Sequence, residues 1–414
     1  MLLAIELENF FSIKNKIRLD FRAGNINTNQ AKMLKDNLIE WNGQKILKTI
    51  GLFGPNASGK SSIIRAIKFC CMMILESHQH NENTRFNFQP FKFDGWQDKP
   101  SRFYIDFVCE GIEYEYEYTL TPTEILEESL YYYPNGRKAK VFERKGTEYT
   151  FGTKVLERPK DVALATSNKN LFLSRASSMN RELAKTIYRF FLNTFLLDLV
   201  SLNSTSIEYN FNKYKKVILK ALEICDSDIC DIKLRHKKVT QPVAVGHDDQ
   251  GVSLELRTVD AIDFKTCHKI DPSIQFDMER DESDGTQRLF AILNRMLDVV
   301  SNNKSLMLDE FDRQLHTLLA DFLIDLVHAS PQSQLLFTSH NTNLIDMDRF
   351  RKDQIIFVNK KADGATEVYS LYDFRDFRDT MDAEKGYIQG RFDAIPYVTS
   401  SASTLRQLMK GEEE

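Results

Sequence analysis

The period of hydrophobic and polar positions changes along the chain, and each period predicts a different kind of element. Two-residue alternation predicts strands at 3–7 and 16–21. Tyrosine-rich alternation later in the chain predicts an antiparallel meander, with strands at 102–108, 112–120, 128–133 and 140–142 and a turn at 134–136. Residues 23–45 are polar and rich in Asn, Gln and Lys, which favours a loop.

Apolar residues recur at helical spacing in five further segments, which we expect to be helices at 60–75, 180–200, 214–225, 284–299 and 313–328. Three short apolar runs, at 46–53, 305–308 and 334–338, predict buried strands between them. Strands that alternate with helices indicate an α/β protein. No heptad repeat persists, so no long coiled-coil arm is expected.

Composition narrows the class of protein. The chain has 414 residues, 42% of them hydrophobic and 28% charged, with a net charge of −4. With this net charge, no overall basic field favours binding to nucleic acid. No apolar run approaches the roughly 20 residues that span a bilayer. Six cysteines form no regular framework, and Cys225 and Cys230 have too few neighbouring ligands for a metal site. We expect a cytoplasmic protein with free thiols and no membrane partner.

A glycine-rich loop between a predicted strand and a predicted helix carries the strongest chemical signal. It matches G-x-x-x-x-G-K-[ST], whose backbone N–H groups and helix N-terminus cradle phosphates. The Lys60 amine is expected on the β- and γ-phosphates and the Ser61 hydroxyl on Mg²⁺. The predicted phosphate-binding residues are Gly54, Pro55, Asn56, Ala57, Ser58, Gly59, Lys60, Ser61 and Ser62. The expected cofactors are ATP and Mg²⁺.

Acidic and polar residues follow two of the other predicted strands. Asp309 and Glu310 come directly after the run 305–308, which suits one carboxylate for Mg²⁺ and one beside an attacking water. His340 follows the strand 334–338 with only Ser339 between them, at a strand end where polar residues meet ligands in α/β folds. Upstream, Ser283 precedes a helix as a potential N-cap.

The order of these segments resembles the layout of ABC-class ATPases, and the opening strand, Asn-Phe pair and second strand resemble the heads of the SMC, RecF and OLD families. The resemblance implies that Ser283, Gly285 and Gln287 form the signature motif and that Asp309 holds Mg²⁺ through a water molecule. It also implies that Glu310 is the general base, Asp312 the D-loop aspartate and His340 the switch histidine. The expected fold is an ABC-ATPase head, with a P-loop mixed sheet and an antiparallel β subdomain. We expect lobes at 1–175 and 270–414 and an inserted helical or mixed lid at 176–269.

A narrower resemblance joins the segments 283–286, 309–316, 339–344 and 384–392 to prokaryotic ATP-binding proteins of abortive-infection and anti-phage loci. This group includes the AbiL/RloA type and the AriA ATPase of PARIS systems. In the broader class, the signature serine of one subunit completes the nucleotide site of another. The resemblance thus implies an ATP-dependent head-to-head dimer, or a larger ring, that controls a separate nuclease or toxin. Because only a short segment follows His340, we expect no TOPRIM nuclease of the kind found in OLD-type proteins.

Other functions and roles remain open at this stage. A RecF- or SMC-like DNA-binding ATPase in repair or maintenance is the alternative function, with the basic run 235–238 as either a nucleic-acid contact or a solvated hairpin end. A transporter subunit fits less well, because a long stretch separates Ser61 from Ser283. Gln89 is the candidate glutamine that senses Mg²⁺ and the γ-phosphate, although Gln97 lies close by.

Overall fold

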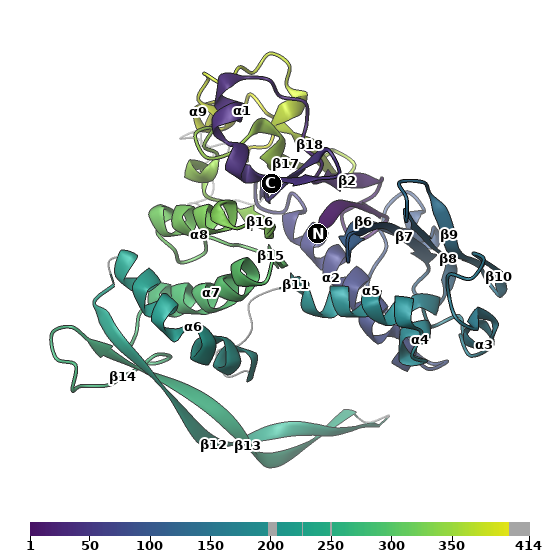
Figure 1. Ribbon diagram of the computed structural model, residues 1–414, viewed down its shortest axis with the longest axis horizontal. Coiled ribbons are helices and arrows are strands. Elements are labelled where there is room, and N and C mark those ends of the chain that lie inside the picture. The colour runs from purple at the N-terminus through teal and green to yellow at the C-terminus, as the bar shows by residue number, and fades with distance from the viewer. Residues whose placement is uncertain (198–204, 226, 249–250, 397–414) are drawn as a thin grey trace, which may run out of the picture.

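The computed structural model describes residues 1–197, 205–225, 227–248 and 251–396. Two larger sheets dominate it (Figure 1). The first has seven antiparallel strands in the order β10-β9-β8-β7-β6-β1-β2. Their bounds are Leu2–Glu8 for β1, Ile17–Asp20 for β2, Ser101–Cys109 for β6, Ile112–Leu120 for β7, Ile125–Tyr132 for β8, Ala139–Lys145 for β9 and Glu148–Phe151 for β10. The predicted N-terminal strands and meander are confirmed.

The second sheet is mixed and has six strands in the order β11-β15-β16-β5-β17-β18. Its first five strands run parallel, and β18 pairs antiparallel with β17. The bounds are Thr49–Phe53 for β5, Phe195–Leu197 for β11, Ser305–Leu308 for β15, Gln334–Ser339 for β16, Ile355–Lys360 for β17 and Thr366–Ser370 for β18. A mixed sheet beside an antiparallel one confirms the predicted α/β fold class.

Alternation along the parallel strands sends side chains into two cores. Ile50 and Leu52 of β5 join the core shared with helix α2 (Lys60–Glu76) and the antiparallel sheet, whereas Phe53 joins the other core. That second core includes buried residues of α6 (Thr205–Ile224), α7 (Asp284–Ser301) and α8 (Thr317–Ala329). The mixed sheet is therefore covered by α2 on one face and by α7 and α8 on the other (Figure 1).

Gln334 at the start of β16 links the two sheets. Its side-chain oxygen accepts a hydrogen bond from the Leu2 amide at 2.6 Å, and its side-chain nitrogen donates to the Leu2 and Leu47 carbonyls at 2.9 and 3.2 Å. All of these groups are buried, so the bonds are shielded from water. This buried amide holds the N-terminal strand of the antiparallel sheet against the mixed sheet.

Several elements differ from the sequence prediction. The segment 23–45 is not a plain loop, since it contains α1 (Asn29–Met33) and strands β3 (Leu38–Trp41) and β4 (Gln44–Leu47). The helix expected at 180–200 ends early as α5 (Glu182–Asn193), because the chain then enters β11 beside β15; residues 198–200 lie outside the described part. The helix expected from 313 begins only at Thr317, because Glu310 and Gln314 have φ values of 49° and 61°.

The segment 176–269, expected as a lid, contains α5, β11, α6 and a long hairpin of β12 (Ile229–Asp248) and β13 (Gly251–His268). β14 (Phe276–Asp277) follows this segment and pairs with β13. Figure 1 shows this hairpin extending away from the sheets. The basic residues Arg235 to Lys238 lie within β12 and not at a hairpin end. Two short helices, α3 (Pro159–Leu164) and α4 (Phe172–Ser178), precede α5, and α9 (Ala383–Ile388) follows the last strand.

Candidate nucleotide-binding site

Three parallel strands bring the predicted site residues to one edge of the mixed sheet. β16 lies between β5 and β15, with Ser339 paired to Phe53 and Leu308 paired to Phe337. Because all three strands point the same way, the loops that follow them leave from the same edge. The edge therefore carries the glycine loop 54–59, the acidic pair 309–310 and His340.

The glycine loop is packed closely against the β17–β18 hairpin. A Cβ atom on Gly54 would lie 2.1 Å from the Val358 carbonyl oxygen, and one on Gly59 would lie 2.0 Å from Thr366 Oγ1. Gly59 also has a φ of 113°, which side chains disfavour. Thr366 donates its hydroxyl to the Ser58 carbonyl at 3.0 Å, which fixes the loop from behind. These contacts explain why the two glycine positions exclude larger residues.

Helix α2 begins at Lys60, directly after the left-handed Gly59, so its free N–H groups face the loop. Ser61 and Ser62 lie half-buried in its first turn. The Lys60 amine donates to the Gly54 and Pro55 carbonyls at 2.7 and 3.0 Å, which bends the side chain back over the loop. Burial lowers the Lys60 pKa to about 8, with Asp309 and Glu310 opposing that shift. The amine therefore lies within electrostatic range of both acids.

A threonine that the sequence prediction missed positions the acidic pair. Thr338 in β16 donates its hydroxyl to Asp309 Oδ1 at 2.6 Å and accepts a hydrogen bond from the Glu310 amide at 2.8 Å. The backbone amide of Phe311 also bonds to the Thr338 carbonyl at 3.0 Å. These bonds hold the chain as it leaves β15, where Glu310 adopts its positive φ. The only available sequence signal was a hydroxyl at the end of a buried strand.

His340 is exposed at the end of β16 and lies near the same charges. Partial burial lowers its pKa, and Lys60 lowers it further, whereas Glu310, Asp312 and Asp309 act in the opposite direction. The structure thus brings Lys60, Asp309, Glu310, Asp312 and His340 together. Their catalytic and binding roles stay predictions.

The predicted signature segment begins α7 on the other side of the acidic loop. Ser283 caps the helix, because its hydroxyl oxygen accepts from the Thr286 amide at 3.2 Å. The Gln287 side chain donates to the Glu279 and Glu282 carbonyls at 3.2 and 3.0 Å. Within the described residues, neither Ser283 nor Gln287 has a hydrogen bond to the glycine loop of its own chain.

The same helix contacts the loop after Glu310. Gln314 donates to Asp284 Oδ2 at 3.1 Å, and a Cβ on Gly285 would lie 3.0 Å from the Gln314 carbonyl oxygen. Arg288 donates to the Glu310 carbonyl at 3.1 Å. Sequence reasoning did not single out Gln314 or Arg288. Both connect the signature helix to the acidic loop of the same chain.

Gln89 is linked to the glycine loop only through other residues in the described chain. Its side chain is exposed, and its carbonyl accepts a hydrogen bond from the Phe11 amide at 2.8 Å. The turn that contains Phe11 also contains Ser12, which bonds to Thr366 behind the glycine loop. These contacts connect Gln89, through Phe11 and Ser12, to Thr366 behind the glycine loop. Among the described residues, no side-chain hydrogen bond joins Gln89 or Gln97 to the glycine loop itself. The assignment of either glutamine stays a prediction.

The donors at the sheet edge fit Mg²⁺ better than a metal held by protein ligands alone. No group of three or more His, Cys, Asp or Glu residues in the described part of the chain could hold a metal ion. Mg²⁺ retains several waters and takes few protein ligands, so the Ser61 hydroxyl and the Asp309 carboxylate with ATP phosphates would suffice. Thr338 engages one Asp309 oxygen and leaves the other available.

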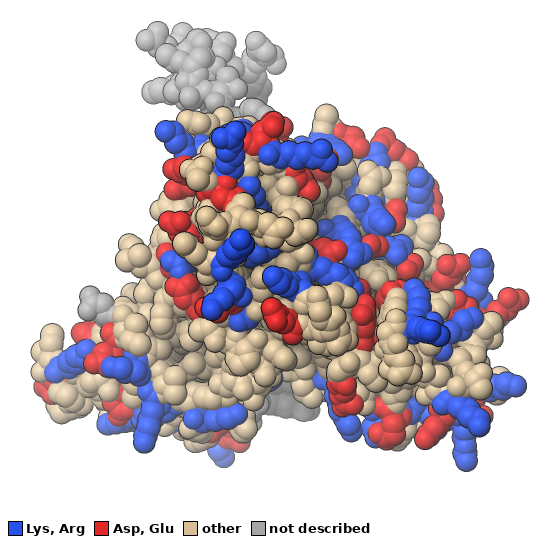
Figure 2. Space-filling model, turned by 45° about the horizontal axis from the view of Figure 1, so that its top comes forward, with Lys and Arg blue, Asp and Glu red and all other residues tan. Residues whose placement is uncertain are grey.

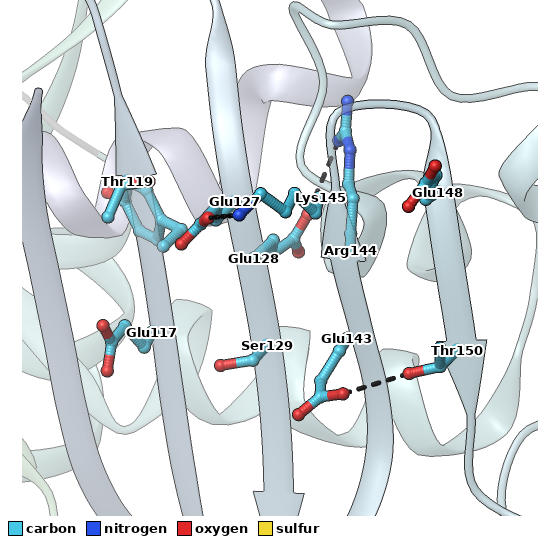
Figure 3. A pocket seen from close by; sticks show the side chains of 11 residues that line it. Glu117, Thr119, Glu127, Glu128, Ser129, Glu143, Arg144, Lys145, Glu148 and Thr150 are labelled. Carbon is cyan, nitrogen blue, oxygen red and sulfur yellow. Dashed lines mark hydrogen bonds and ion pairs between the residues drawn. The ribbon is translucent and has the colours of Figure 1, made fainter.

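A separate hollow lies on the antiparallel sheet and contains none of these residues. Its volume is about 350 Å³, and strands β7 to β10 line it (Figure 3). The buried Glu128 beneath it accepts hydrogen bonds from Tyr116 and from the first two amides of α4, and it lies 3.7 Å from Arg144. Burial raises the Glu128 pKa, and these internal bonds occupy its carboxyl oxygens, so Glu128 has a structural role.

Of the comparisons with known proteins, the one with family models places the chain in a family. A family model described as "AAA domain, putative AbiEii toxin, Type IV TA system" matches residues 50–217 and 268–346. A search of curated proteins finds no match. No helix in the described residues is long and apolar enough to cross a membrane.

Among solved structures, the chain is similar to an Smc head bound to the C-winged helix domain of ScpA, with 16% identity and a TM-score of 0.40 over 89% of this chain and 97% of that one. The SMC head of Thermotoga maritima has 14% identity and a TM-score of 0.38 over 89% and 98%. An Smc head with an extended coiled coil, derived from Pyrococcus furiosus and bound to the C-terminal domain of ScpA, has 16% identity and a TM-score of 0.41 over 89% and 96%. The family match covers more than half of the sequence, and the chain therefore belongs to the AAA-domain family described as putative AbiEii toxin, Type IV TA system.

Proposed function

We propose that this protein binds ATP with Mg²⁺, hydrolyses it slowly, and uses the cycle to control a separate toxic effector in anti-phage defence. The supporting observation is the convergence of Lys60, Asp309, Glu310 and His340 at the carboxyl edge of the mixed sheet. Family membership supports the nucleotide chemistry and a toxin–antitoxin setting. ATP hydrolysis itself, the effector and the trigger are parts of the proposal.

In the proposed reaction, the loop amides and the N-terminus of α2 bind the phosphates, and Lys60 exchanges its bonds to the Gly54 and Pro55 carbonyls for phosphate oxygens. Glu310 accepts a proton from the water that attacks the γ-phosphate, and His340 contacts the oxygens that gain charge. Mg²⁺, when bound, would neutralise charge on the β- and γ-phosphates, with Ser61 and Asp309 as its protein ligands.

The proposed active form is a head-to-head dimer, or a larger ring built from such dimers. Ser283 caps α7 but has no hydrogen bond to its own glycine loop in the described chain. Ser283 and the amides at the start of α7 are suited to bind the γ-phosphate held by a second copy. Each nucleotide site would then need two chains, and hydrolysis would separate or reorient them.

The test compares the wild-type protein with Glu310→Gln. In this variant the rate of phosphate release should fall by about a hundredfold or more, because the proton acceptor is gone. ATP binding should be retained. Light scattering should show the variant as an ATP-dependent dimer. Lys60→Ala is the control that loses ATP binding. Unchanged turnover and unchanged assembly in Glu310→Gln would overturn the proposal.

DNA binding is the weaker alternative. Figure 2 shows acidic and basic side chains interspersed over the visible face. Within the hairpin, Lys237 lies 3.5 Å from Asp263 and His236 lies 3.1 Å from Glu208, so nearby acids offset part of the basic run. Salt-sensitive duplex binding that is lost on mutation of Arg235 and Lys238 would favour this alternative.

A further inference from the structure

A groove with an aromatic floor lies beside helix α2, and we call it the Met72 groove. Its volume is about 380 Å³, and its walls are the outer face of α2 and the segment that follows this helix. Phe10, Phe69 and Phe86 line its floor and are almost fully buried. The Phe10 and Phe69 rings pack at 5.7 Å between centroids, so the floor is held by internal contacts.

The rim of the Met72 groove combines an exposed apolar side chain with cations. Met72 is 52% exposed, although it lies next to buried aromatic residues. Arg65 and Arg85 are both exposed, and neither forms an ion pair within the described chain. Among the described residues that line the groove, Glu76 is the only acidic one. An occupant that complements these groups has apolar bulk for the floor and negative charge for the rim.

We propose that the Met72 groove binds a segment of a partner protein in which a bulky apolar side chain is flanked by carboxylates. Methionine adapts its shape to varied apolar partners, which suits an entry to such a floor. Arginine forms directional pairs with carboxylates, which would fix the orientation of the segment. A single-stranded nucleic acid fits less well, because Phe10 and Phe69 are buried and pack against each other, so their rings offer little free face for base stacking.

The groove is built on the helix that begins at the glycine loop. Arg65 and Met72 lie on α2, whose first residue is Lys60. On its other side, the groove contains Phe11, whose amide bonds to the Gln89 carbonyl. A bound segment would therefore contact elements that lead to the nucleotide site. Identifying the partner as the effector rests on the proposed function, whereas the docking chemistry does not.

The experiment measures fluorescence anisotropy of a labelled acidic–apolar peptide, Asp-Glu-Leu-Phe-Asp-Glu, with the full chain and without nucleotide. Two control peptides replace either the acids by lysine or the apolar pair by serine, and a labelled single-stranded oligonucleotide tests the other class of ligand. We expect saturable binding of the acidic–apolar peptide only. Because nucleotide is absent, failure of the ATPase proposal would leave this result unaffected.

Matched variants locate the binding to the groove. Met72→Glu, and the pair Arg65→Glu with Arg85→Glu, should each weaken peptide binding by roughly tenfold or more, because they remove the apolar contact or reverse the rim charge. Arg137→Glu, in an exposed turn remote in sequence, should have no effect. All substituted side chains are exposed, so thermal melting should confirm that the variants fold. Equal binding of the lysine peptide, retained binding by Met72→Glu, or oligonucleotide binding that these variants abolish would overturn the proposal.

Discussion

The Thr338 hydroxyl lies 2.6 Å from Asp309 Oδ1 and donates a hydrogen bond to it. Thr338 is buried at the end of β16. This strand lies between β5, which leads to the glycine loop, and β15, which leads to the acidic pair. The Thr338 hydroxyl oxygen also accepts a hydrogen bond from the Glu310 amide at 2.8 Å. One side chain therefore orients both the proposed Mg²⁺ ligand and the proposed general base.

Thr338→Val should disturb both roles without adding bulk, since valine keeps the shape of threonine but lacks the hydroxyl. We expect ATP turnover to fall about ten- to hundredfold and the Mg²⁺ concentration for half-maximal rate to rise, as for other residues that orient metal ligands. The measurement is phosphate release against Mg²⁺ concentration. Thr338→Ser, which retains the hydroxyl, should recover most of the activity. A serine variant as impaired as the valine variant would assign Thr338 to packing alone.

A mixing experiment tests whether Ser283 acts on a second copy. Lys60→Ala removes the phosphate-binding amine, and Ser283→Arg places a bulky cation at the start of α7, so each homodimer should be inactive. In a mixed dimer, one site combines both defects and the other pairs an intact glycine loop with an intact α7. We expect mixing to restore part of the ATPase activity. Mixtures with no more activity than either variant alone would place Ser283 in its own chain's site.

A glycine substitution in the phosphate-binding loop tests the loop's backbone geometry without changing any charge. Gly59→Ala would place a Cβ atom 2.0 Å from Thr366 Oγ1 at a φ of 113°, so we expect loss of ATP binding and of thermal stability. Gly43→Ala is the matched control, because Gly43 also has a positive φ of 75° but has nothing within 4 Å of its Cβ position. That control should cost only about 1–2 kcal/mol and leave ATP affinity unchanged. Calorimetric melting and nucleotide titration measure the two effects.

The chemistry of the site was easier to predict from sequence than the way in which it is supported. The glycine loop, Asp309, Glu310 and His340 each follow a short apolar run, and parallel strands bring the ends of such runs to one edge. Thr338 and Gln314 carry no comparable signal, because their importance depends on which strand and which helix come to lie beside them. Their roles follow from the strand order β15-β16-β5 and from the approach of α7 to the acidic loop.

In the insert, the spacing of apolar residues did not predict every element. Helical spacing predicted helices at 180–200 and 214–225, where the structure has α5 and α6, but α6 begins earlier, at Thr205. The helical spacing also continued through Phe195, which instead begins a strand beside β15. Tertiary pairing decided that residue's structure against its local periodicity. The long β12–β13 hairpin was not predicted from the sequence. Its packing against α6, which includes the rings of Phe211 and Phe264 at 5.0 Å between centroids, is a tertiary contact that periodicity alone does not reveal.

The lowered pKa of Lys60 predicts how ATP affinity depends on pH. In the nucleotide-free protein the amine is charged below about pH 8 and neutral above it. Phosphate charges favour the protonated amine, so binding should take up a proton above pH 8, and affinity should fall up to tenfold for each further pH unit. ATP titrations from pH 7 to about pH 9.5, in buffers of different ionisation enthalpy, measure both the ATP affinity and the number of protons taken up on binding. Lys60→Arg, which stays charged, should bind with a flatter pH profile.

His328 predicts a loss of stability in acid. It is 7% exposed, its Nε2 lies 2.8 Å from Thr49 Oγ1, and burial lowers its pKa from 6.5 to about 3, with further lowering by Lys48. The unfolded chain therefore binds a proton more readily than the folded protein between these values. The stability contribution is present above about pH 6.5 and is lost as the pH falls toward 3, by up to about 1.4 kcal/mol per pH unit. His328→Gln keeps a polar group beside Thr49 but cannot be protonated in this range. Melting temperatures from pH 7.5 to about pH 5 should fall less steeply in this variant than in the wild type, and parallel slopes would exclude His328 as the titrating group.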